Sequence, residues 1–156
     1  MATASGTLSK DFELLVPITV RWGDMDAYGH VNNATFSTYF ETARMKFFEW
    51  VRVFDYKEGE RHAPAIVSAT INFRQQVHYP AELEVGIRCI KVGTKSFTLE
   101  HHLFRAGTDE AVADGTTIIA WVDYAVGKAV PLPDRLKGKL KLPPFFGQWL
   151  SKDLPA

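Results

Sequence analysis

The spacing of hydrophobic residues divides the chain into one long helical segment and several strand segments. Residues 13–22, ELLVPITVRW, are rich in β-branched and aromatic side chains, which predicts a first strand. Pro17 has no amide hydrogen to donate, so we expect this strand at a sheet edge or beside a bulge. Residues 23–33 are dense in Gly, Asp and Asn, which predicts a loop.

A long helix is predicted directly after this loop. Residues 34–54 contain neither Gly nor Pro, and their apolar side chains recur every three or four residues, which is the helical period. These apolar positions are Phe36, Tyr39, Phe40, Ala43, Phe47, Trp50, Val51 and Phe54. Asn32 or Asn33 is a suitable N-cap. Because the apolar face is wide, we expect a large surface to cover it.

Four segments of alternating apolar and polar residues follow the helix. They are 65–73, 83–92, 96–104 and 116–126, separated by turn-like sequences, and in succession they predict an antiparallel meander. The side chains expected on the core side are Val67, Ala69, Ile71, Phe73, Leu83, Val85, Ile87, Cys89, Phe97, Leu99, His101, Leu103, Ile118, Ala120, Val122 and Tyr124. With the first strand and the helix, the pattern predicts an α+β fold in which an antiparallel five-stranded sheet wraps around one long central helix.

The length favours one domain, because 156 residues suffice for one substantial core and are too few for two. We expect a single domain, residues 1–156, with its core at about 12–126. The Pro-rich residues 127–156 are expected to form an extended or partly helical C-terminal appendage.

Composition narrows the classes of function. Eighteen basic residues balance eighteen acidic ones, so neither nucleic acid nor a membrane surface is an expected partner. The lone cysteine, Cys89, excludes an internal disulfide, and its alternating surroundings predict a packing role. The first residues lack the apolar core of a signal peptide and no apolar run is long enough to span a bilayer, so cytoplasmic residence is expected.

Five polar side chains gather in the predicted loop: Asp24, Asp26, His30, Asn32 and Asn33. They are typical of turns and helix caps, which is one interpretation. The other starts from their position just before a helix, whose free N-terminal amides and dipole favour developing negative charge. A carboxylate a few residues upstream of such an oxyanion site could act as nucleophile or general base against a carbonyl group.

The run RWGDMDAYGHVNNATFSTYFETAR resembles the signature of the 4-hydroxybenzoyl-CoA thioesterase family of hotdog-fold proteins. That signature has two aspartates separated by one residue, a glycine three residues later, a short polar stretch and an aromatic-rich helix. The order of predicted elements also matches over residues 12 to 126. The resemblance implies a hotdog fold and hydrolysis of an acyl-CoA thioester without a cofactor. It also implies a homodimer or dimer of dimers with sites at the subunit boundary.

Roles carry over from this resemblance position by position. Asp26 matches the catalytic carboxylate, and Gly29 matches the glycine of the tight turn into the helix. Asn33 falls where the family uses a backbone N–H to polarise the thioester carbonyl. His30 and Asn32 are similar to the His-Val-Asn-Asn run of plant-type acyl-carrier-protein thioesterases.

This chain departs from the plant-type pattern at two positions, so we expect one carboxylate to carry the reaction. That group has an asparagine two residues after the aspartate, where this chain has Tyr28, and its additional glutamate aligns near Ala65. We therefore expect the reaction to depend on Asp26. Asp24 is expected to cap the turn.

Further positions of the resemblance concern substrate binding and the helix. Lys95 and Ser96 match a lysine-serine pair near the family's coenzyme A nucleotide, and Arg74, Arg88 and Lys91 could contribute. An ordinary solvated lysine in a turn is an equally good interpretation of Lys95. Glu41 and Arg44 match a Glu-x-x-Arg pair on the helix, which we expect to be an intrahelical ion pair with a structural role.

The remaining histidines do not indicate a metal site. His62 and His78 lie in predicted loops, and His101 and His102 are adjacent on one strand, so they must face opposite sides. No two of them combine metal-ligand spacing with a carboxylate.

Two alternatives to hydrolysis stay open. The first is a hotdog hydratase or dehydratase, which pairs a loop histidine with a carboxylate; here Asp26 and His30 lack the intervening Asn-Pro of the hydratase motif. The second is a non-catalytic module that binds acyl-CoA on the same fold, because fold alone does not dictate function. The acyl group, and the choice between coenzyme A and acyl-carrier-protein thioesters, are open as well.

Overall fold

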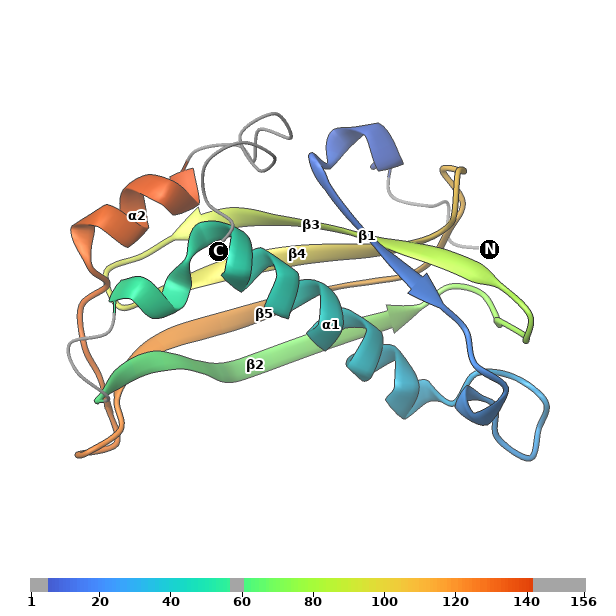
Figure 1. Cartoon of the computed structure of the whole chain (residues 1–156), viewed down its shortest axis with the longest axis horizontal. Helices are drawn as coiled ribbons and strands as arrows, with labels where there is room; N and C mark the ends of the chain where they lie inside the picture. Colours follow the sequence, from blue (N-terminus) through green and yellow to red (C-terminus); the bar gives the residue numbers. More distant parts are fainter. Residues whose placement is uncertain (1–5, 57–60, 142–156) are drawn as a thin grey trace, which may run out of the picture.

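A computed structural model of the chain, whose described residues are 6–56 and 61–141, shows one curled antiparallel sheet with a long helix across its concave face (Figure 1). The strands are β1 (Leu14–Thr19), β2 (His62–Phe73), β3 (Glu82–Val92), β4 (Ser96–Arg105), β5 (Ala111–Asp123) and the short β6 (Lys128–Ala129). The helices are α1 (Asn33–Val51) and α2 (Asp134–Lys141), with 3-10 turns η1 (Ser9–Asp11), η2 (Trp22–Asp24) and η3 (Val53–Tyr56). This is the predicted hotdog architecture, to which β6 adds one short strand.

The order of strands differs from a simple meander. The sheet runs β1-β3-β4-β5-β2, so β3, β4 and β5 are neighbours as predicted, while β2 pairs with β5 rather than with β3. The connection 74–81 explains the difference, because eight residues can carry the chain from β2 at one sheet edge to β3, the neighbour of the opposite edge strand β1, which a hairpin turn cannot. The edge position of β1 confirms the prediction from Pro17.

The predicted core side is confirmed for β3 and β4 and wrong for β5. Ile119 lies opposite Phe97, whose ring contacts Phe48 of α1, so the residues of this parity face the helix. Ile119 and Trp121 are fully buried, whereas Ile118, predicted inside, lies on the convex face with 37% of its surface exposed. The run TTIIAWV is apolar at both parities, so alternation could not distinguish its two faces.

Strand β2 is an edge strand with largely exposed side chains. A bulge between Ile66 and Ser68 leaves Val67 out of the ladder with β5. Of the predicted core side, Val67 is 60% exposed and Phe73 is 52% exposed. The predicted side holds at the end of β2, where Ile71 packs against the core and the ring of Phe73 meets Phe36 of α1. These side chains are covered less than those of β3 and β4 within one chain, because α1 lies closer to β3 and β1.

Helix α1 begins where the sequence predicted. The Asn32 side chain accepts a hydrogen bond from the Ala34 amide, so Asn32 is the N-cap. The helix ends at Val51, with Arg52 in the left-handed region, and Phe54 lies in η3 instead. Its buried face comprises Phe36, Tyr39, Phe40, Ala43, Phe47, Phe48 and Val51.

The predicted ion pair on α1 is not formed among the described residues. No salt bridge joins Glu41 and Arg44 there. Burial lowers the pKa of Arg44 from its usual value, and the negative charge of Glu41 partly offsets that effect. Arg44 is therefore a half-buried cation that Glu41 influences only through space.

The predicted appendage is partly helical. Helix α2 buries Leu136 and Leu140 in the common core, and the Leu132 amide donates to the carbonyl of Thr94 in the β3–β4 hairpin. Residues 142–156 of the appendage lie outside the described part of the chain. Within the described residues, no helix combines the length and apolar character needed to cross a membrane.

Candidate active site

Asp24 fixes the start of the loop that leads into α1. Its carboxylate accepts hydrogen bonds from the Arg21 amide at 2.9 Å, from the Arg21 guanidinium at 3.0 Å and from the Tyr39 hydroxyl at 2.7 Å. Burial alone would raise the pKa of Asp24, but hydrogen bonds from Arg21 and Tyr39 outweigh it and lower that pKa. Asp24 therefore closes the η2 turn and ties it to α1, in agreement with the predicted capping role.

Asp26 follows two residues later in a turn of its own. Its amide donates to the His30 carbonyl, and the Gly29 amide donates to the Asp26 carbonyl, each at 3.0 Å. Gly29 has φ of 82°, a conformation that favours glycine and accounts for its place in this turn. The Asp26 carboxylate accepts the Tyr28 amide at 2.9 Å and the Asn32 side-chain amide at 3.4 Å.

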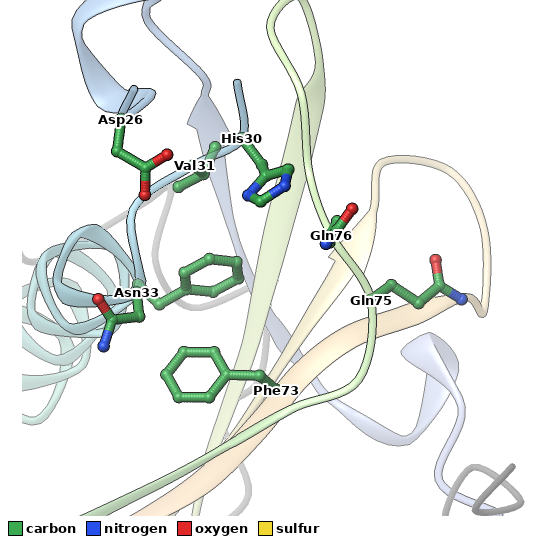
Figure 2. A pocket seen from close by; sticks show the side chains of 8 residues that line it. Asp26, His30, Val31, Asn33, Phe73, Gln75 and Gln76 are labelled. Atoms are coloured by element: carbon green, nitrogen blue, oxygen red, sulfur yellow. The ribbon is translucent and has the colours of Figure 1, made fainter. Parts of the chain in front are cut away.

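A pocket of about 310 Å³ opens beside Asp26, within the size range of small-molecule sites. Figure 2 shows Asp26 and Asn33 along one side of it and Gln75 and Gln76 along the other. The complete lining is Asp26, His30, Val31, Asn33, Phe36, Phe73, Gln75 and Gln76. The loop before α1, the first turn of α1 and the end of β2 with its following connection therefore converge on one cavity.

The first turn of α1 supplies the electrophilic side of the pocket. Asn33 is the first helical residue, so its amide has no partner within the helix. The Ala34 amide is taken by the Asn32 side chain, whereas the Asn33 amide has no acceptor among the described residues. A free amide at a helix N-terminus, supported by the helix dipole, suits the oxygen of a carbonyl group that gains negative charge.

Two aromatic rings form the apolar wall. Phe36 of α1 and Phe73 of β2 meet edge to face, with centroids 5.3 Å apart and planes at 90°. Phe36 is buried, and Phe73 is half exposed toward the open side of β2. The pocket thus brings Asp26 and the first helical residue, Asn33, together with a surface suited to hydrocarbon.

The predicted coenzyme A residues do not join this pocket within one chain. Ser96 lies opposite Ala120 of β5, and Ala120 lies opposite Ala65 of β2. Ala65 precedes Phe73 by eight residues, so Lys95 and Ser96 lie roughly 26 Å along the sheet from the pocket. Figure 1 shows the β3–β4 hairpin beside α2, at the opposite end of the sheet from the loop before α1.

Arg74 is next to the pocket, but its guanidinium is already hydrogen-bonded to another side chain. It donates to the buried carboxylate of Asp114 at 2.8 and 3.2 Å, and this contact raises the pKa of Arg74. Arg88 likewise donates to Glu100 at 2.7 Å. Neither arginine presents a free cation beside Asp26.

Sequence reasoning missed the pair Gln75 and Gln76. Both follow β2 after Arg74 and reach the site because the end of β2 meets the first turn of α1, where Phe73 contacts Phe36, although more than forty residues separate Gln75 from Asn33. The signal available in the sequence was two adjacent glutamines just after a predicted strand. In the described part of the chain, no three His, Cys, Asp or Glu side chains are grouped as metal ligands.

Comparison with known proteins extends these observations. A family model described as the thioesterase-like superfamily matches residues 20–140. Long-chain acyl-CoA thioesterase FadM of Escherichia coli is 27% identical over 80% of this chain and 94% of that protein.

Two solved structures share the fold. The PA5185 protein of Pseudomonas aeruginosa has a TM-score of 0.74 at 30% identity, covering 85% of this chain and 92% of that one. A thioesterase of Thermus thermophilus, complexed with coenzyme A and Zn, has a TM-score of 0.72 at 27% identity, covering 84% and 99%. The narrower assignment to 4-hydroxybenzoyl-CoA thioesterases stays a prediction. The chain belongs to the thioesterase-like superfamily and is a hotdog-fold thioester hydrolase.

Proposed function

We propose that this protein hydrolyses acyl-CoA thioesters to a carboxylic acid and coenzyme A, with Asp26 as the catalytic carboxylate. The observation that carries the proposal is that one pocket is lined by Asp26 and by Asn33, whose amide has no acceptor among the described residues. The acyl-CoA part rests on similarity to FadM and to a thioesterase that binds coenzyme A.

The chemistry follows from the two polar sides of the pocket. The thioester oxygen accepts a hydrogen bond from the Asn33 amide, and Asp26 attacks the carbonyl carbon or removes a proton from an attacking water. Either route places negative charge on the oxygen that the amide and helix dipole stabilise. The carbon–sulfur bond then breaks and the coenzyme A thiolate leaves. On the general-base route the water oxygen is now part of the carboxylic acid, and the proton held by Asp26 passes to the thiolate. On the nucleophilic route water hydrolyses the acyl–Asp26 anhydride, which releases the carboxylic acid and restores Asp26, and the remaining proton of that water passes to the thiolate.

The roles of Gly29 and His30 are indirect in this proposal. Gly29 allows the tight turn that presents the carboxylate, and the His30 carbonyl accepts the Asp26 amide. The His30 ring lines the pocket beside Val31. We expect both residues to shape the site rather than to exchange protons with the substrate.

We propose that the active unit is a homodimer, or a dimer of dimers, joined through β2. This edge strand exposes Ile66, Val67 and Phe73, and an unpaired apolar edge invites a second strand. An antiparallel pair of β2 strands would set the His62 end of one copy beside the Phe73 end of the other. Lys95 of the partner subunit would then approach the pocket, which would account for its distance from Asp26 within one chain.

The substitution Asp26→Asn tests the catalytic assignment. The amide can neither attack a thioester nor accept a proton, so kcat for release of free thiol should fall by about 10²-fold or more. Binding of the acyl-CoA should persist, because the shape is unchanged. Asp109→Asn is the matched control, since Asp109 is an exposed carboxylate bonded to Ser9. An Asp26→Asn enzyme with more than about a tenth of wild-type kcat would exclude the assignment.

The same assay separates the open alternatives. A hydratase or dehydratase would change the acyl chain without releasing thiol, and a binding module would retain the ester intact. Coenzyme A and acyl-carrier-protein thioesters of the same acyl group, compared side by side, would identify the carrier.

The substitution Lys95→Ala tests the dimer and the place of the nucleotide. If Lys95 of the partner subunit contacts a phosphate, KM should rise about fivefold with kcat unchanged, since an exposed contact contributes roughly 1 kcal/mol. The effect should shrink with salt and vanish for an acyl-N-acetylcysteamine, which lacks the nucleotide. A 17.6 kDa monomer in light scattering, or an equal loss of kcat on both substrates, would contradict the arrangement.

A further inference from the structure

The connection between β2 and β3, residues 74–81, touches the turn that carries Asp26. The Val31 amide donates to the Val77 carbonyl at 2.8 Å, and this bond holds the end of the loop before α1 in place. Nδ1 of His78 lies 2.8 Å from the carbonyl oxygen of Gly29. The rings of His78 and His30 also meet, with centroids 5.6 Å apart at 70°.

The position of the Gly29 carbonyl determines the position of the whole turn. The turn is closed by the Gly29 amide on the Asp26 carbonyl and by the Asp26 amide on the His30 carbonyl. Fixing the peptide group between Gly29 and His30 therefore fixes both ends of the turn. Tyr28 at its tip is 85% exposed, so the tip itself offers little restraint.

The Asp26 side chain has few restraints of its own. Its bond to Asn32 is long, at 3.4 Å, and its bond to the Tyr28 amide belongs to the same exposed turn. The direction of the carboxylate therefore depends on the position of the turn as a whole. The contact from His78 reaches that turn from a different part of the chain.

We propose that His78 is a positioning residue for the reaction, acting on Asp26 through the carbonyl of Gly29. A carbonyl oxygen only accepts hydrogen bonds, so Nδ1 of His78 carries the hydrogen and donates it. His78 holds the turn at the distance from Asn33 that catalysis requires, and its ring supports the ring of His30. This inference rests on the proposed function and adds a residue that lies outside the pocket lining.

Three substitutions separate the hydrogen bond from the rest of the side chain. His78→Asn places an amide donor close to the position of Nδ1. His78→Gln moves the same amide one bond farther, close to the position of Nε2. His78→Leu has comparable bulk and no donor. His78 is exposed, so all three should fold, and thermal unfolding verifies this.

The expected result is a split between kcat and KM. With an acyl-CoA that the wild type hydrolyses, His78→Leu and His78→Gln should lose about tenfold or more in kcat with KM nearly unchanged, because small misplacements of a catalytic group are costly. His78→Asn should recover most of kcat. Wild-type kcat in His78→Leu, or equal losses in all three variants, would overturn the proposal.

A second measurement does not depend on turnover. Hydrogen exchange of the Asp26 and Gly29 amides, which close the turn, should be faster in His78→Leu than in wild type and restored in His78→Asn. Unchanged exchange in His78→Leu would overturn the inference even if hydrolysis is confirmed. A wild-type protein that hydrolyses no acyl-CoA would instead refute the proposed function, so the two failures are distinguishable.

Discussion

His101 should make the protein less stable in mild acid. Its ring is buried on β4, with 1% of its surface exposed, and it packs against Phe40 of α1 at a centroid distance of 5.1 Å. Burial is the largest influence on this group and the positive charge of Arg44 is the second, and together they lower the pKa of His101 to about 4. The ring is therefore neutral in the folded protein at neutral pH, and Nε2 has no hydrogen-bond partner among the described residues.

The sign and size of the effect follow from proton linkage. In the unfolded chain a histidine titrates near 6.5, so between about pH 6.5 and 4 the unfolded state binds a proton that the folded state rejects. Stability is therefore lost as the pH falls through this window. With about 1.36 kcal/mol for each pKa unit, lowering the pH from 7.5 to 5.0 should cost about 2 kcal/mol through His101.

Urea unfolding of the wild type and His101→Leu at pH 7.5 and 5.0 measures this contribution. The change in packing is present at both pH values, so the difference between the two pH values isolates the titration. That difference should be about 2 kcal/mol smaller in the variant than in the wild type. His101→Gln serves if the leucine variant does not fold, and protein concentration is held fixed because association also contributes to stability.

An equal loss of stability in wild type and variant would refute the reasoning. It would mean that the folded protein accepts the proton at His101 despite the burial. Arg44 offers an independent check, because its positive charge is the second cause of the shift. In an Arg44→Met background the contribution of His101 should shrink without disappearing, since burial remains the larger cause.

Three further substitutions test the loop before α1, the sheet and helix α2. Tyr39→Phe removes the hydroxyl donor from the buried Asp24 and should cost roughly 1.5–3 kcal/mol in urea unfolding, because hydrogen bonds to charged groups are the stronger ones. Gly115→Ala places a methyl group in a steric clash with the Thr70 carbonyl oxygen, so β2 must shift from β5 and the melting temperature should fall. Gly138→Ala on α2 meets nothing within 4 Å and should leave the melting temperature equal or higher.

Periodicity predicted the elements well and the order of the strands poorly. Alternation in β3 and β4 identified the core side because one face of each strand packs on α1. It carries no information on which strands are neighbours, so the place of β2 beside β5 was missed. The failure at β5 has a different cause, since Ile118 and Ile119 are both apolar and only the register with β4 tells them apart.

The residues of the candidate site also divide into those that local sequence predicts and those that only tertiary packing brings together. Asp26, Gly29, His30 and Asn33 lie within eight consecutive residues, so local turn and cap chemistry was enough to group them. Gln75 and Gln76 join them only because the end of β2 meets the first turn of α1 in the tertiary structure. A site assembled from distant segments cannot be completed by motifs, because no local pattern requires the second segment.

The two aspartates of the motif show how surroundings assign different roles to identical side chains. Asp24 is buried, and its oxygens are occupied by the Arg21 amide, the Arg21 guanidinium and the Tyr39 hydroxyl. Such a carboxylate is held in its ionised form and has neither the exposure nor the free lone pairs to meet a substrate. Asp26 is half-buried at the pocket wall, with one short hydrogen bond and one long one, so lone pairs remain for reaction. Neither carboxylate could take over from the other without rebuilding its hydrogen bonds, and this is why the proposed chemistry requires Asp26.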